Sequence, residues 1–134
     1  MGYESKLYVC KRIEHNGDVY NEVLAAINMC KMEDFYEIFN DELDGDFCGM
    51  DGNMSRFNQY GDEINPKLVD NYGDPLTYTS IDNVISWCAG YMAGSSCPYW
   101  RIAVLEKMLY SIKENFEPVS KDGRERLIVV HYGY

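Results

Sequence analysis

The stretch KLYVCKRIEHNGDVYNEVLAAINMCK (residues 6–31) organises the fold, because it contains the clearest turn signal in the chain. Asn16-Gly17, at its centre, favours a type I′ turn since both residues tolerate positive φ. The apolar residues before this turn fall mostly on one parity, as in a half-buried strand; they are Leu7, Val9 and Ile13. We therefore expect an N-terminal β-hairpin whose returning strand covers residues 19–31. Residues 24–27 (LAAI) would also suit a helix, and both assignments stay open there.

Two amphipathic helices are expected in the C-terminal half. Ser80 is a typical N-cap for the first helix, Asp82 lies in its first turn, and Gly94 ends it. The apolar face of this helix has helical spacing; its members are Ile81, Val84, Ile85, Cys88, Tyr91 and Met92. Pro98 suits the first position of the second helix. The apolar stripe of that helix comprises Ile102, Leu105, Leu109, Ile112 and Phe116.

The other elements complete the prediction of the fold class. Residues 32–43 (MEDFYEIFNDEL) predict a short acidic helix. The core side of this helix would comprise Phe35, Ile38, Phe39 and Leu43. Residues 44–74 predict a long acidic loop, since they contain glycine and proline breaks and little periodicity. Residues 76–79 predict a short strand, and the run LIVV (127–130) predicts a C-terminal strand covered on both faces. The order indicates a single α+β domain over residues 1–134, with an antiparallel or mixed sheet.

The negative charge of the chain is concentrated in one region. The chain has 22 Asp and Glu against 12 Lys and Arg, a formal net charge of −10. Residues 33–74, the acidic segment, hold twelve of these acids against two bases, Arg56 and Lys67, so the remainder of the chain is neutral. A content of 46% apolar residues indicates a folded protein and not a disordered acidic tail. A negative electrostatic field concentrated in one region of a protein favours cationic partners.

Within the predicted acidic helix, Asp34, Glu37 and Asp41 fall at positions i, i+3 and i+7, so they would line one face about 5.4 Å apart. Acids at i, i+4 repel, and acids near the C-terminal end of a helix oppose its macrodipole. Helix stability therefore does not explain this arrangement, whereas a basic partner would. The candidate partner-binding residues are Asp34, Tyr36, Glu37, Asp41, Glu42, Asp44, Asp46, Asp51 and Tyr60.

We expect no catalytic residues, no metal site and no cofactor. The sequence lacks a phosphate-binding loop, a dinucleotide fingerprint and the common hydrolase motifs. Residues 44–49 (DGDFCG) begin like a calcium loop, but Cys48 and Ser55 stand where that loop needs an oxygen ligand and a bidentate Glu. Neither His15 nor His131 has a plausible nucleophile near it in sequence, so we expect a turn residue and a strand residue.

The sequence also predicts a cytoplasmic protein. The N-terminus lacks the apolar run of a signal peptide, and no stretch approaches the roughly 20 apolar residues of a membrane span. The five cysteines are an odd number and contain no C-x-x-C, which is typical of a reduced compartment. Lys and Arg are too few and too dispersed for direct binding of nucleic acid. We therefore expect neither a membrane nor a nucleic acid as partner.

Three short stretches resemble small acidic proteins encoded by phages and prophages, a mostly uncharacterised group. These stretches are residues 1–9 (MGYESKLYV), 72–74 (YGD) and 80–87 (SIDNVISW). The resemblance covers about a third of the chain and carries over no catalytic residues. It implies a non-enzymatic inhibitor of the anti-CRISPR or anti-restriction kind, acting in the host cell. The acidic segment would then imitate nucleic acid and occupy a basic groove of a host defence or replication protein.

Other interpretations stay open at this point. The acidic segment would also suit a solvated surface that serves only solubility. In that case a Tyr-rich apolar surface would bind a host protein, as twelve tyrosines are many for 134 residues. A third possibility is an oligomeric binder of a small anionic nucleotide signal, held by Arg101, Arg124 or Arg126. A homodimer is compatible with each of these functions.

Overall fold

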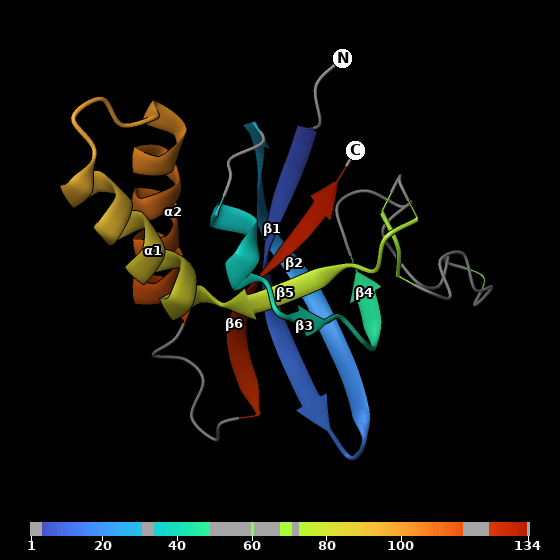
Figure 1. Ribbon diagram of the computed structural model, residues 1–134. Coiled ribbons are helices and arrows are strands. Elements are labelled where there is room, and N and C mark those ends of the chain that lie inside the picture. The colour runs from blue at the N-terminus through green and yellow to red at the C-terminus, as the bar shows by residue number, and fades with distance from the viewer. Residues whose placement is uncertain are drawn as a thin grey trace.

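The computed structural model describes residues 4–30, 34–48, 60, 68–70, 73–116 and 124–133. These residues form an α+β fold, in which a six-stranded curled sheet carries two α-helices on one side (Figure 1). In chain order, the elements are β1 (Glu4–His15), β2 (Asp18–Cys30), the 3₁₀ helix η1 (Phe35–Ile38), β3 (Asp41–Glu42), β4 (Asp46–Cys48), β5 (Thr77–Ser80), α1 (Ile81–Gly94), α2 (Trp100–Phe116) and β6 (Glu125–Gly133). The predicted fold class is confirmed.

The N-terminal hairpin is confirmed with the expected turn. Strands β1 and β2 pair in antiparallel fashion from Glu4↔Cys30 to His15↔Asp18. The turn residues Asn16 and Gly17 have φ values of 51° and 84°, the positive values that this dipeptide tolerates. Residues 24–27 belong to β2, so the helical alternative for this run is wrong. A register shift opposite Leu24 forms a β-bulge, which bends the hairpin and increases its twist.

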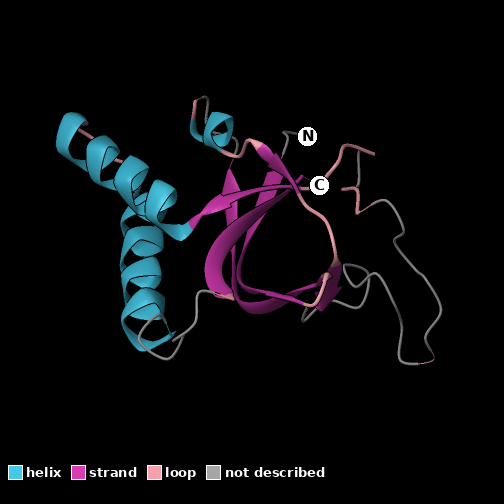
Figure 2. Cartoon of the chain, turned by 90° about the horizontal axis from the view of Figure 1, so that it is seen from below, coloured by secondary structure: helices cyan, strands magenta, loops and turns pink. Residues whose placement is uncertain are grey.

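The sheet is curled so strongly that its two edges approach one another. Its strand order is β3-β5-β6-β1-β2-β4, with β2 and β4 parallel and all other neighbours antiparallel. The edge strands β3 and β4 are nevertheless separated only by residues 43–45. A connection this short spans at most about 14 Å, because an extended chain advances about 3.3–3.6 Å per residue. The flat distance across six strands is larger, so the sheet must bend into the rounded shape seen in Figure 2.

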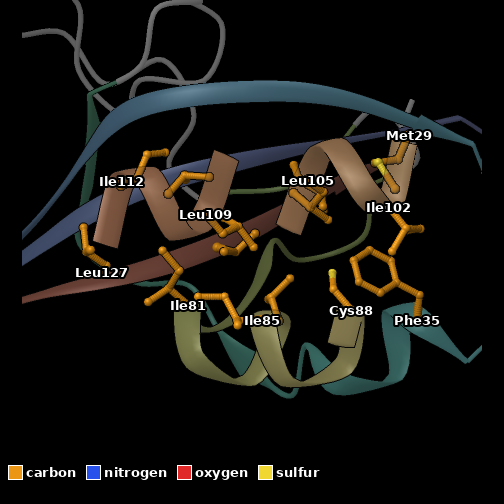
Figure 3. Close-up of a cluster of buried hydrophobic side chains, with 14 of the residues drawn as sticks. Met29, Phe35, Ile81, Ile85, Cys88, Ile102, Leu105, Leu109, Ile112 and Leu127 are labelled. Carbon is orange, nitrogen blue, oxygen red and sulfur yellow. The ribbon is translucent and has the colours of Figure 1, made fainter. Parts of the chain in front are cut away.

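Each face of this sheet covers its own hydrophobic core. The outer core lies between the sheet and the two helices, and it includes Leu7, Val9, Leu127 and Val129. Figure 3 shows side chains of α1 and α2 pointing toward one another in this core. The inner core fills the curl of the sheet; its members are Tyr8, Cys10, Leu43, Phe47, Leu68, Leu76, Tyr78, Ile128 and Val130. Residues 127–130 of β6 alternate between the two cores, which confirms the prediction of a strand covered on both faces.

The two α-helices largely follow their sequence signals. Ser80 caps α1, since its Oγ accepts a hydrogen bond from the main-chain N–H of Asn83 at 3.1 Å. The expected start of the second helix at Pro98 is wrong: α2 begins at Trp100, and the Tyr91 hydroxyl accepts from the N–H of Tyr99 at 2.8 Å. The buried stripe of α2 is confirmed except at its end. Phe116 is 42% exposed, because the last turn of α2 runs past the core.

The expected α-helix over residues 32–43 is wrong in its described part. Residues 34–43 contain only the four-residue η1 and the two-residue β3. Asp34 precedes η1 with φ of 70° and its side chain makes no capping hydrogen bond. The physical reason is tertiary. Phe35 and Phe39 belong to the outer core and Leu43 to the inner core, so the chain has to cross from one face of the sheet to the other.

The long loop predicted over residues 44–74 contains regular structure in its described part. It contains β4, and an isolated bridge joins Val69 to Pro75. Residues 49–59, 61–67 and 71–72 of this stretch lie outside the described residues, as do residues 31–33. The short strand expected at residues 76–79 is confirmed as β5, one residue later.

Candidate functional site

Buried apolar residues spaced four apart anchor residues 34–48 of the acidic segment to the sheet. They are Phe35, Phe39, Leu43 and Phe47, and each is at most 5% exposed. The first two pack in the outer core and the last two in the inner core. Phe35 also lies against Trp87 of α1, with ring centroids 4.7 Å apart. Four side chains therefore anchor this stretch to the two cores of the sheet.

The acidic side chains of the same stretch point outward. The exposed candidate residues are Asp34, Glu37, Asp41, Glu42 and Asp44. Asp46 is half-buried, and Tyr60 is 78% exposed. Asp51 lies outside the described residues. Five of the predicted residues are therefore exposed carboxylates on one stretch of chain, residues 34–44, which we call the acidic row.

The geometry of this row differs from the prediction. Asp34, Glu37 and Asp41 do not share one face of a helix, because η1 ends at Ile38 and Asp41 lies in β3. Asp41 and Glu42 lie in the extended chain of β3, where residues advance about 3.2–3.4 Å each instead of the 1.5 Å of a helix, and Asp44 lies in the turn that follows. The destabilising i, i+4 repulsion of an acidic helix therefore does not arise here. The charges are spaced along an edge of the molecule.

Arg12 of β1 binds Asp44 and so links the acidic row to the hairpin. Sequence analysis did not predict this role. Arg12 is 3% exposed, and its guanidinium Nη2 forms an ion pair with the Asp44 carboxylate. Its Nη1 donates to Asn21 Oδ1 at 3.0 Å and to the Asp44 carbonyl at 3.3 Å. Asn21 Nδ2 in turn donates to the carbonyls of Asp44 and Asp46, at 2.8 and 3.0 Å. Two hairpin side chains thus hold the turn that joins β3 to β4.

The surroundings of Arg12 keep its guanidinium protonated. Burial lowers the pKa of Arg12, but hydrogen bonds to Asp44 and Glu14 raise this pKa by more, so it lies above its usual value. The guanidinium also stacks over the ring of Tyr78, 5.0 Å from its centroid. The sequence contained a signal for this role. Tyr8, Cys10 and Arg12 are two residues apart, so their side chains lie on the same face of β1. A charged residue on a buried strand face needs a partner of opposite charge.

Gly45 makes the same turn possible. Its φ of 84° lies in the left-handed region, which residues with a Cβ rarely adopt. A Cβ at this position would stand 2.5 Å from the Val19 carbonyl oxygen and 2.6 Å from the Val19 Cβ. The backbone of the turn therefore lies directly against β2. Asp44 and Asp46 flank a tightly packed turn, and their main-chain carbonyls are part of its structure.

Folding also brings a hydroxyl to His131, which the sequence did not indicate. Ser5 Oγ and His131 Nε2 lie 3.0 Å apart. The ring of His131 stacks on Tyr36 with centroids 4.3 Å apart and contacts Phe39 at 5.8 Å. Burial lowers the pKa of His131 to about 4, while the charge of Asp70 acts in the opposite direction. Ser5 is completely buried, so a substrate cannot reach this serine–histidine pair, which instead packs η1 onto the sheet.

Tyr36 consequently has a structural role. This candidate partner-binding residue belongs to η1 and is half-buried, because its ring stacks on His131. The exposed tyrosines of the described residues are Tyr20, Tyr60 and Tyr110. Tyr20 lies on β2 and Tyr110 on α2, so these two belong to different elements.

The three candidate anion-binding arginines are divided between two places. Arg126 contacts Glu14 and the Tyr78 hydroxyl, each at 3.3 Å, and Arg124 lies 3.2 Å from His15. Arg101 instead binds the Asn28 carbonyl near the other end of the hairpin. The arginines therefore do not converge on one ligand.

No group of three or more His, Cys, Asp or Glu side chains in the described part of the chain has the geometry to hold a metal ion. Cys10 and Cys88 are buried thiols; burial, and to a lesser extent the charge of Glu106, raises the pKa of Cys88 to about 12. Neither described α-helix has the length and apolar character to cross a bilayer.

Comparisons with protein-family models, with curated proteins and with solved structures gave no match to this chain. The most distinctive surface feature of the described residues is the exposed acidic row, which buried side chains anchor to the sheet.

Proposed function

We propose that this chain is a non-enzymatic inhibitor that uses its acidic segment to occupy a basic nucleic-acid-binding groove of a host protein. Its target would be a defence or replication protein, and the inhibitor would act in the cytoplasm of the host cell. Such a role agrees with the resemblance to small acidic phage proteins of the anti-CRISPR and anti-restriction kind. One observation carries the proposal: five exposed carboxylates lie on a stretch of chain that four buried apolar residues hold in place.

The fixed backbone favours this function over a solubilising one. Solubility requires only charge, whereas these acids are held on a chain that is anchored in both cores. A preorganised charged surface loses less conformational entropy on binding than a flexible acidic tail does. Its field also accelerates encounter with a basic surface.

Charge, and not an exact match of spacing, supports a nucleic-acid groove as the target. Asp41 and Glu42 are consecutive residues of β3, so their side chains leave the strand on opposite faces. Carboxylates on one face of extended chain therefore recur about every 6.4–6.8 Å. A groove whose Lys and Arg side chains bind phosphates would meet acids on either face of this stretch.

The test uses two variants with the same change in net charge. D34K/E37K/D41K reverses exposed acids of the row, and D18K/E22K/E114K reverses exposed acids elsewhere. Wild-type protein immobilised at low salt captures its target from host extract, and added DNA or RNA should displace the captured protein. We expect D34K/E37K/D41K to lose this capture and D18K/E22K/E114K to retain it.

Salt provides a second measure. Binding through several charge pairs should weaken steeply between low and physiological ionic strength. Equal capture by both triple variants would refute the proposal, and so would a captured protein that nucleic acid does not displace. Asp44 is kept unchanged in both variants, because its contacts with Arg12 are structural.

A further inference from the structure

The turn of the N-terminal hairpin contains a chemically reactive dipeptide that the proposed function does not use. Asn16 and Gly17 join β1 to β2, and both residues are exposed. This turn lies at the bottom of Figure 1, away from both α-helices. An asparagine that precedes glycine is prone to attack by the main-chain nitrogen of that glycine, because no Cβ hinders the approach. The sequence contains the Asn-Gly dipeptide only here.

The main-chain nitrogen of Gly17 is available for this attack. Among the described residues, the N–H of Gly17 donates no hydrogen bond, and the strand pairing ends at His15↔Asp18. Apart from its chain neighbours, no atom lies within 4 Å of the place where a Cβ of Gly17 would stand. The turn therefore has room for the rotation about ψ of Asn16 that brings the Gly17 nitrogen to the side-chain carbon Cγ of Asn16.

His15 places a proton beside the group that has to leave. Its Nε2 lies 3.1 Å from Asn16 Nδ2, and its Nδ1 lies 3.2 Å from Arg124 Nη1. A guanidinium can only donate, so Nδ1 accepts and the proton of the neutral ring is on Nε2. The amide nitrogen of Asn16 becomes basic once Gly17 has added to Cγ. At that point Nε2–H faces a nitrogen that can take up its proton and depart as ammonia.

We propose that Asn16 is a site of spontaneous deamidation in which His15 acts as general acid. The Gly17 nitrogen loses its proton to solvent and forms a bond to Asn16 Cγ. The bond between Cγ and Nδ2 then breaks, and ammonia leaves with the proton from His15 Nε2, which solvent replaces. The product is a cyclic succinimide, and water opens it at either of its carbonyl carbons to give aspartate or isoaspartate. The net reaction consumes water and releases ammonia, and nothing is oxidised or reduced.

The two products affect the hairpin differently. Asp-Gly favours the same type I′ turn as Asn-Gly, so aspartate at position 16 preserves the hairpin. Isoaspartate inserts a methylene group into the main chain of the turn, and this disrupts the His15↔Asp18 pairing because loop length sets the register of a hairpin. Both products add a negative charge beside His15 and Arg124. This inference does not depend on the proposed function.

A second turn shows why the dipeptide alone does not suffice. Asp44-Gly45 is capable of the same cyclisation, and it too would yield isoaspartate. A Cβ of Gly45 would stand 2.5 Å from the Val19 carbonyl oxygen, so the backbone there has no room to rotate. Arg12 also binds the Asp44 carboxylate. Asp44 should therefore stay unchanged while Asn16 reacts.

The experiment follows the Asn16 amide while the purified protein is incubated at neutral pH. Peptide mapping by mass spectrometry measures its conversion, and electron-transfer fragmentation distinguishes aspartate from isoaspartate. Asn28 and Asn115 are exposed as well, but Met29 and Phe116 follow them, so they are controls within the same sample. We expect Asn16 to convert at least about tenfold faster than either control, because only glycine leaves the attacking nitrogen unhindered. Conversion of Asn16 no faster than these controls would overturn the proposal.

The variant H15Q tests the role of His15. Loss of the proton donor should slow conversion of Asn16 in the folded protein by about tenfold, within the range of general acid catalysis. In concentrated urea, which removes the contact between His15 and Asn16, wild type and H15Q should convert at the same rate. Near-ultraviolet circular dichroism verifies that H15Q is folded in buffer. Equal rates for the two folded proteins would overturn the role of His15, and so would an equal slowing in buffer and in urea.

Discussion

Acidification should destabilise this protein through His131, the histidine beneath η1. The pKa of His131 is about 4 in the folded chain, against 6.5 for an ordinary histidine, because burial disfavours the charged ring. Between these values the unfolded chain binds a proton that the folded chain does not. The contribution of His131 is therefore complete above about pH 6.5, falls as the pH decreases toward 4, and stays constant below that.

The magnitude follows from the difference between the two pKa values. One pKa unit corresponds to about 1.36 kcal/mol, so the full effect is about 3 kcal/mol. Partial exposure of the ring reduces this figure, and we expect about 2 kcal/mol between pH 7 and pH 4.5. Ser5, Tyr36 and Phe39 surround the ring, so its protonation should loosen η1 from the sheet first.

The assay compares wild type with H131Q and H15Q. Gln at position 131 keeps a group that can hydrogen-bond to Ser5 but removes the titration. The free energy of unfolding in urea should fall with decreasing pH by about 2 kcal/mol more in wild type than in H131Q. H15Q, which alters the exposed turn histidine, should follow wild type. Parallel curves for wild type and H131Q would refute the reasoning, and so would an NMR titration that gives His131 an ordinary pKa.

Three further predictions concern the turn at Gly45, the Arg12 contacts that hold this turn, and the N-cap of α1. Gly45→Ala should destabilise the protein by several kcal/mol more than Gly73→Ala in thermal unfolding, because both glycines have positive φ but only at Gly45 does a Cβ strike β2. Equal losses would contradict this packing. Arg12→Leu should lower the free energy of unfolding by about 2–4 kcal/mol, and Arg12→Lys should restore little of it, since Lys cannot reproduce the planar fork. Full rescue by Lys would show that charge alone matters. Ser80→Ala should remove about 1 kcal/mol from the stability of the fold, measured by urea unfolding, and an unchanged midpoint would argue against the cap.

The sequence alone determined the elements whose signals are local. Asn16-Gly17 specifies the hairpin because few residues tolerate two successive positive φ values. Ser80 and the apolar spacing after it specify α1, and the continuous run in residues 127–130 specifies a strand buried on both faces. The concentration of charge between residues 33 and 74 is likewise a property of the sequence.

Only the tertiary structure decided the form of the acidic row. Residues 32–43 have the apolar spacing of a helix, but Phe35 and Phe39 belong to the outer core while Leu43 and Phe47 belong to the inner one. A single α-helix cannot deliver side chains to both faces of a sheet, so packing overrides local propensity. The same folding pairs Arg12 with Asp44, which are 32 residues apart, and Ser5 with His131, which are 126 apart. Such contacts depend on how the sheet curls, and no local pattern in the sequence encodes that curvature.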